Sequence, residues 1–290
     1  MSDLPGIYKD VNRFLVLDLE TVADEELVSA VAADPSQPYA DQVKRLLEER
    51  RARSAGRSDF LPIPYHRPVA ACGLDVVEED GCLAVTDLFS WTDHQPETEA
   101  RFLADLWDRL SGTTLVTFRG RGFDVPVLEL RSLKLQVSSP FWFSDANRGA
   151  GHHLDLADLL SNQGATQGAP LDLYAKLVGL PGKEAVAGKD VQSLYSEGAL
   201  HRIAAYCMTD VLQTYFLLLR FRLLEGSLSQ DGYTRSITSA RRSLPKLFAS
   251  RLAAEERAFL DGFLQRCAAF FKPVSRKAVG GRRLLSANSA

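Results

Sequence analysis

The stretch RFLVLDLET, residues 13–21, most constrains the fold, because it is a buried-strand pattern that carries two acids. Side chains at alternate positions of a strand point to the same face, so Asp18 and Glu20 would lie side by side. Two adjacent, half-buried carboxylates repel one another and lose hydration. A bound cation would offset that cost, and the stretch therefore raises the possibility of a metal site at the end of a core strand.

Size and composition indicate a soluble globular protein. The chain has 290 residues, of which 46% are hydrophobic and 24% charged. It shows neither a basic segment followed by an apolar run at its start nor a stretch of about 18 apolar residues, so we expect no secretory signal and no membrane span. Its four cysteines form no CxxC pair, which favours reduced thiols in a cytoplasmic protein over a zinc site or disulfide framework.

Charge is distributed unevenly along the chain. Residues 231–290 contain twelve Lys or Arg against four Asp or Glu, whereas the first 230 residues contain 22 basic and 33 acidic side chains. An acidic body with a basic tail suits a metal-binding catalytic domain that attracts a polyanion. The alternative is a solvated helical extension that happens to be rich in arginine.

The hydrophobic pattern predicts a mixed α/β architecture. Strands are expected near 13–20, 69–77, 82–90 and 113–118, with a turn at 79–81. Helices are expected at 96–111, 123–135, 171–178 and 198–226, and residues 152–164 should begin extended and become helical. An antiparallel three-stranded start followed by α/β units is typical of a mixed sheet flanked by helices.

Two segments fit this pattern less directly. Residues 22–60 look like an insertion with a helix-like basic run, and the Pro-rich stretch 60–68 should be extended. Beyond residue 230 the chain is basic and helical, with a Gly/Arg/Ser-rich end that we expect to be disordered. We therefore predict a main domain over 1–230 and a basic helical extension over 231–290.

Three further polar residues stand out against apolar surroundings. Asp124, in GFDVPVL, lies where a strand leads through a loop into a helix, so it could also serve as a helix cap. Tyr206 and Asp210 are four apart and share one face of an apolar helix, where a buried acid needs a partner. Tyr206 could instead be a core tyrosine with a local hydrogen-bond acceptor. Oxygen-only donors suit Mg²⁺ or Mn²⁺, and two such ions can stabilise both oxygens of a phosphoryl displacement.

The stretches DLET, TFRGRGFDVPVL and YCMTD occur in that order, each on the expected kind of element. Together they resemble the motifs of the DEDD 3′–5′ exonucleases of the RNase H-like (DnaQ-like) superfamily, in the subclass with a tyrosine. Within that group the chain looks most like the stand-alone exonucleases related to the proofreading domain of bacterial family-B DNA polymerases. The resemblance covers roughly residues 12–225.

The resemblance implies an RNase H-like fold and a role for each motif residue. Two Mg²⁺ or Mn²⁺ ions would be held by Asp18, Glu20, Asp124 and Asp210. Tyr206 would position the attacking water or help to deprotonate it, and Asp155 would lie near the site without being a ligand. Substrate contacts are expected from Leu19, Thr21, Arg119 and Phe123. Relatives often have an asparagine near position 119, so substrate handling here could differ: Arg119 could contact a phosphate or be a solvated loop charge.

We therefore expect hydrolysis of the terminal phosphodiester bond at a 3′ end, releasing nucleoside 5′-monophosphates. Single-stranded ends fit best, because a narrow site must admit a splayed terminal nucleotide. DNA is the expected substrate through the resemblance alone, and an exoribonuclease is an alternative because nothing recognisable reads the 2′-hydroxyl. The other alternative is a catalytically silent module that binds nucleic acid or a protein partner on the same fold.

Overall fold

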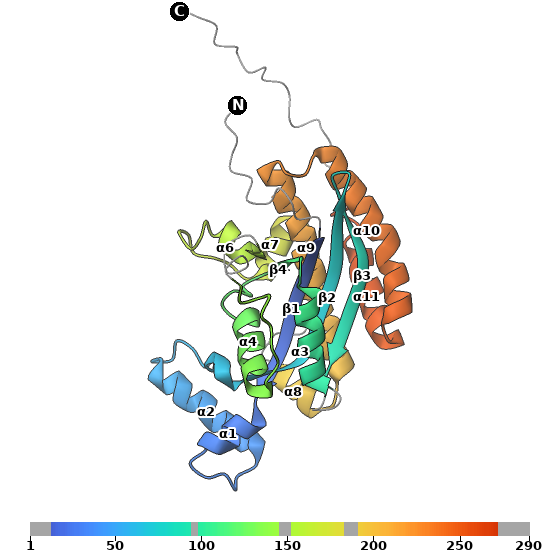
Figure 1. Ribbon diagram of the computed structural model, residues 1–290. Coiled ribbons are helices and arrows are strands. Elements are labelled where there is room, and N and C mark those ends of the chain that lie inside the picture. Colours follow the sequence, from blue (N-terminus) through green and yellow to red (C-terminus); the bar gives the residue numbers. More distant parts are fainter. Residues whose placement is uncertain (1–12, 94–97, 145–151, 183–190, 272–290) are drawn as a thin grey trace, which may run out of the picture.

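A five-stranded mixed sheet organises the computed structural model of the protein, which describes residues 13–93, 98–144, 152–182 and 191–271 (Figure 1). Its strands, in chain order, are β1 (Arg13–Ala23), β2 (His66–Glu79), β3 (Cys82–Thr92), β4 (Thr114–Thr117) and β5 (His153–Asp155). Across the sheet the order is β3-β2-β1-β4-β5, with the first three strands antiparallel and β1, β4 and β5 parallel. The predicted mixed sheet is confirmed, and both hairpin strands are longer than expected.

Helices connect and flank these strands. They are α1 (Glu25–Val31), α2 (Tyr39–Arg53), α3 (Thr98–Arg109), α4 (Asp124–Leu135), α6 (Leu156–Leu160), α7 (Leu171–Leu177), α8 (Val191–Ser196), α9 (Leu200–Glu225), α10 (Gln230–Arg251) and α11 (Ala254–Arg266). The expectation of an extended segment over 60–68 is wrong at the 3-10 turn η1 (Ile63–Tyr65), where the Tyr65 N–H donates to the Pro62 carbonyl at 3.0 Å. Among the described helices, none combines the length and apolar character needed to cross a membrane.

Helices α3 and α4 cover one face of the sheet (Figure 1). The odd-numbered residues Leu15, Leu17 and Leu19 of β1 are buried in the same hydrophobic cluster as Phe102 and Leu106 of α3. Alternation along the strand sends these leucines to one side of the sheet. The even-numbered residues must then face the opposite side, which is where the site is built.

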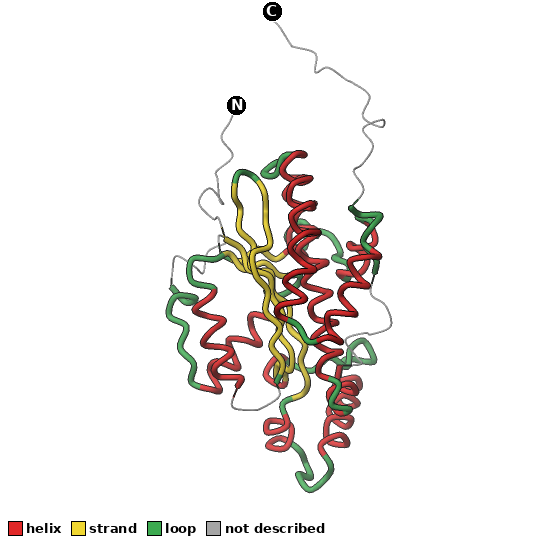
Figure 2. Tube along the Cα trace, turned by 90° about the vertical axis from the view of Figure 1, so that its right-hand side faces the viewer, coloured by secondary structure: helices red, strands yellow, loops and turns green. Residues whose placement is uncertain are grey.

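Helices α9, α10 and α11 contribute to a second cluster on the opposite face, so that helices lie on both sides of the sheet (Figure 2). Phe14 and Val16 of β1 share this cluster with Tyr215 and Phe216 of α9. Helix α9 is buried along most of its length, as its apolar sequence predicts. The sheet therefore presents β1 directly to the helix that carries Tyr206 and Asp210.

Helix α10 belongs to this same core rather than standing apart from it. Tyr233, Ile237, Leu244 and Phe248 are buried against residues of the sheet and of α9. The Leu83 N–H, in the edge strand β3, donates to the α10 hydroxyl of Ser236 at 2.9 Å. The expected division at residue 230 therefore does not coincide with a break in the hydrophobic core. The expected disorder at the C-terminus and the start of a helix at 96 lie outside the described residues.

The insertion forms two helices with a small core of its own. Val28 of α1, Val43 of α2 and Leu61 are buried together beside the end of β1. Asp24 caps α1 by accepting the Leu27 N–H at 2.8 Å. Its carboxylate also pairs with the buried Arg131 of α4. The insertion is therefore fixed to α4, the helix that begins at Asp124.

Candidate active site

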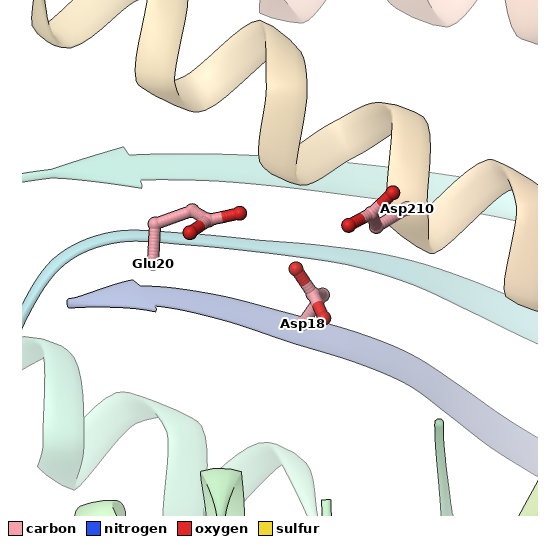
Figure 3. Close-up of side chains that lie close together, drawn as sticks. All are labelled: Asp18, Glu20 and Asp210. Carbon is pink, nitrogen blue, oxygen red and sulfur yellow. The ribbon is translucent and has the colours of Figure 1, made fainter. Parts of the chain in front are cut away.

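Strand β1 places Asp18 and Glu20 on the α9 side of the sheet. They continue the row of Phe14 and Val16, because every second side chain of a strand faces the same way. Both carboxylates point towards α9 in Figure 3. Along this face of β1, the buried residues Phe14 and Val16 are thus followed by two acids, Asp18 and Glu20, towards the C-terminal end of the strand.

Helix α9 supplies the third acid. Its Tyr206 and Asp210 are one helical turn apart and are only 4% and 6% exposed. Carboxylate oxygens of Asp18, Glu20 and Asp210 lie within 4.8 Å of one another (Figure 3). Acids almost 200 positions apart in the chain are therefore gathered at one point.

Small side chains let α9 approach the sheet closely. Cys72 of β2 lies opposite Asp18 in the strand register, and its thiol donates to the Ala204 carbonyl at 3.4 Å. The Cys207 thiol donates to the backbone carbonyl of Asp18 at 3.2 Å. Burial raises the pKa of Cys207 well above its ordinary value, so this thiol keeps its proton and its role as a donor. These contacts hold the helix and β1 together beside the acids.

Asp124 begins α4 and lines the same cleft, but it is not one of the three acids that lie within 4.8 Å of one another. Burial, together with the negative charges of Asp155 and Asp210, raises the pKa of its carboxyl to about 7. The Leu19 N–H hydrogen-bonds to the carboxylate and opposes this shift. Asp124 is thus poised to lose its proton readily when a cation is bound nearby.

Asp155 fixes the loop that leads to Asp124. Its carboxylate accepts the backbone N–H groups of Arg119 at 2.8 Å and of Arg121 at 2.9 Å, and it caps α6 by accepting the Ala157 N–H at 3.0 Å. Gly120 is required in this loop, since a Cβ there would lie 2.5 Å from Oγ1 of Thr117. Asp155 is 1% exposed, so its carboxylate is directed to the backbone of this loop and not to solvent.

A cleft of about 610 Å³ opens over these residues. It is lined by Asp18, Leu19, Glu20, Phe60, Phe118, Arg119, Gly122, Phe123, Asp124, Asp155, Asp158, Tyr206 and Asp210. All but one of the predicted site residues are therefore brought together. Thr21 does not line the cleft, and its hydroxyl instead hydrogen-bonds to Nδ1 of His66 at 2.9 Å.

Four residues that line the cleft, Phe60, Phe118, Gly122 and Asp158, were not among the predicted site residues. Phe118 directly follows the buried strand β4, and Asp158 follows Asp155 by three residues, so proximity to the motifs could have indicated both. Phe60 comes from the insertion and carries no motif signal. The Arg119 guanidinium also lines the cleft and donates to the Ala169 carbonyl at 3.2 Å.

The donor set fits a hard divalent cation. The clustered groups offer carboxylate oxygens only, which suits Mg²⁺ or Mn²⁺ better than zinc. Three acids this close would repel one another without a positive charge among them. Their position in an open cleft, rather than in a sealed core, leaves room for a substrate phosphate.

Comparison with protein families matches residues 58–267 to a family described as a predicted 3′–5′ exonuclease related to the exonuclease domain of PolB. The chain belongs to this family. Family membership supports exonuclease activity in general, a nucleic-acid substrate and the RNase H-like fold that the mixed sheet displays. No curated protein matches the chain.

The matched span of this exonuclease family differs from the resemblance seen in the sequence. It includes Asp124, Tyr206 and Asp210 but starts after Asp18 and Glu20. In the fold, the strand that carries Asp18 and Glu20 nevertheless lies next to the matched region, because β1 pairs with the matched strands β2 and β4. The match also continues through α10 and α11, past residue 225, where the motif-based resemblance ends.

Proposed function

We propose that the protein is a two-metal-ion 3′–5′ exonuclease that removes nucleoside 5′-monophosphates from single-stranded nucleic acid, with DNA preferred. The observation that carries the proposal is the convergence of Asp18, Glu20 and Asp210 in a cleft that also contains Asp124 and Tyr206. Family membership supports the reaction class. The strand preference rests on the resemblance to proofreading exonucleases.

The proposed roles follow from the positions of the side chains. Asp18, Glu20 and Asp210 would hold one divalent ion, and Asp124, across the cleft, would complete the site for a second. Bound Mg²⁺ or Mn²⁺ would supply the positive charge that offsets negative charge developing on the attacking and leaving oxygens. Arg119, at the cleft wall, would face a phosphate of the strand.

In the proposed reaction a water oxygen attacks the terminal phosphorus and the bond to the 3′ oxygen of the preceding nucleotide breaks. Tyr206 would hydrogen-bond to that water and orient it, since its side chain lines the cleft one helical turn from Asp210. The departing 3′ oxygen takes up a proton and becomes the new 3′-hydroxyl end. The products are a nucleoside 5′-monophosphate and a strand shorter by one nucleotide.

The Asp18→Asn and Asp210→Asn variants test the metal assignment. Each replaces one anionic ligand by a neutral amide, and we expect activity on a 5′-labelled DNA oligonucleotide to fall at least about 100-fold, because even residues that only orient ligands cost 10–100-fold. Asp105→Asn is the matched control, since its side chain is 73% exposed on α3. Activity that survives in both cleft variants would contradict the assignment.

The same assay separates the alternatives. Matched DNA and RNA strands, labelled at either end and incubated with Mg²⁺, Mn²⁺ or chelator, report polarity, sugar preference and metal dependence together. A ladder that shortens from the 3′ end faster on RNA would favour an exoribonuclease. Binding without any metal-dependent product would favour a silent nucleic-acid-binding module.

A further inference from the structure

Phe60 is an exposed aromatic side chain on the wall of the cleft. It is 53% exposed, and it lines the same cleft as the clustered acids. The proposed reaction assigns it no role. A single exposed phenyl ring is ordinary on a protein surface, so the relevant observation is its place in the cleft, where it can meet a bound strand.

The backbone of Phe60 is held in place by the insertion. The Arg50 side chain of α2 donates from Nε to the Phe60 carbonyl at 3.1 Å, and the Phe60 N–H donates to the Ser58 hydroxyl at 3.1 Å. The next residue, Leu61, is buried in the core of the insertion with Val28. The ring is therefore directed outwards by a backbone that is fixed on both sides.

The ring of Phe60 is also supported by its neighbours. It stacks on His66 with centroids 4.9 Å apart and meets the edge of Phe123 at 5.5 Å. His66 is itself fixed, because Nδ1 pairs with the Thr21 hydroxyl and Nε2 with the Leu61 carbonyl at 3.1 Å. Burial lowers the pKa of His66, so the stacked imidazole is neutral near pH 7. One face of the ring thus packs on His66, while more than half of the surface of Phe60 remains exposed to solvent.

We propose that Phe60 is a stacking platform for an unpaired nucleobase near the 3′ end of the substrate strand. Every base has a π-face, so an aromatic ring can hold bases without reading their identity. Within a duplex the faces of a base are covered by its neighbours, so the platform favours single-stranded or splayed ends. This inference rests on the proposed function, which identifies the ligand as a nucleic-acid strand. It would give the insertion a role in binding substrate.

Binding measurements test the platform separately from catalysis. Affinity for a fluorescent 12-nucleotide DNA strand is measured by anisotropy with Ca²⁺ in place of Mg²⁺, so that cleavage is suppressed. We expect Phe60→Ala to weaken binding about 5- to 150-fold, the range found when a base-stacking aromatic is removed. Phe60→Trp, which keeps an aromatic face, should retain affinity, whereas Phe60→Leu should resemble the alanine variant.

A scan of abasic strands identifies the stacked base. One base at a time is removed from the last four nucleotides, and each strand is bound to wild type and to Phe60→Ala. The penalty of the alanine variant should vanish on one of these strands, because the partner of the ring is then absent. Phe259→Ala is the matched control, since Phe259 is 39% exposed on α11 and does not line the cleft.

The outcomes distinguish the two hypotheses. An alanine penalty that is equal on all four abasic strands, or equally large for Phe259→Ala, would overturn the platform even if the wild type degrades DNA. If Phe60→Ala shows the expected base-dependent loss of affinity but the wild type yields no product with Mg²⁺ or Mn²⁺, the nuclease proposal is overturned and the platform is left intact.

Discussion

Asp155 illustrates how one buried carboxylate can order a loop at the candidate active site. It accepts three backbone N–H groups, two from the loop that leads to Asp124 and one from α6. Arg119 in that loop has φ of +67°, a left-handed conformation that is unfavourable for a residue with a side chain. The hydrogen bond to its N–H helps to hold this conformation and so the approach of the chain to Asp124.

The Asp155→Ala variant should therefore lose activity through positioning. We expect a 10- to 100-fold fall in activity at limiting Mn²⁺, as found for residues that orient metal ligands, with partial recovery at saturating Mn²⁺. Asp155→Asn keeps one acceptor oxygen and should fall between wild type and alanine. Activity is measured against Mn²⁺ concentration, and a loss that is independent of metal in every variant would speak against a positioning role.

The sequence predicted the acidic residues of the site more readily than the other residues that line the cleft. Asp18, Glu20 and Asp210 interrupt apolar patterns, so each needed a chemical reason, which the proposed metal site would provide. Phe60 breaks no pattern, since an aromatic residue beside prolines is unremarkable in a loop, and only its exposed position in the cleft distinguishes it. Thr21 is the last residue of the first motif, DLET, but its hydroxyl hydrogen-bonds to His66, and Thr21 does not line the cleft.

At the scale of elements, the docking of the insertion depends on a buried charge network. Arg131 of α4 pairs with Asp24 and, through Nε at 2.5 Å and Nη2 at 2.7 Å, with Glu99 of α3. Lys134 also donates to Asp24, at 2.8 Å. This network ties the start of α1 to the two helices that cover one face of the sheet.

Asp24→Ala should destabilise the protein by about 3 kcal/mol, because it leaves Arg131 with one of its two anionic partners and removes the cap of α1. Glu26→Ala is the matched control, since Glu26 also contacts Lys134 but its side chain is 83% exposed, and it should change stability by less than about 0.5 kcal/mol. Urea unfolding measures both, and equal effects would contradict the role of the buried network.

The same carboxylate predicts how this effect depends on pH. Burial alone would raise the pKa of Asp24, but hydrogen bonds from Lys134, the Leu27 N–H and Arg131 lower it below the ordinary 3.8. The unfolded chain then takes up the proton more readily, so the stabilisation is complete above the unfolded-state pKa and is lost as pH falls through the folded-state pKa. The gap in unfolding free energy between wild type and Asp24→Ala should shrink below about pH 4 and stay constant above pH 5.

Considered as a whole molecule, the fold places basic charge on the outside of a core helix. The sequence indicated a charged extension after residue 230, because twelve Lys or Arg face only four Asp or Glu in residues 231–290. Yet Tyr233, Ile237, Ala240, Leu244 and Phe248 recur at helical spacing, and this apolar stripe packs on the sheet. Neither feature alone predicts which surface the stripe covers, since that depends on the long-range approach of α10 to β3. Deleting 231–290 to test nucleic-acid attraction would therefore also remove core residues.

Truncation is expected to show that the sheet cannot keep its structure without α10 and α11. A fragment of residues 1–230 loses the buried Ile237, Leu244, Phe248, Leu260 and Phe263. At roughly 2 kcal/mol each, their burial is comparable to the roughly 5–15 kcal/mol net stability of a whole domain. The fragment should therefore lack a cooperative thermal transition by circular dichroism, whereas truncation after residue 271, which keeps every described helix, should preserve one. Cooperative unfolding of the shorter fragment at the wild-type midpoint would instead establish an independent domain that ends near residue 230.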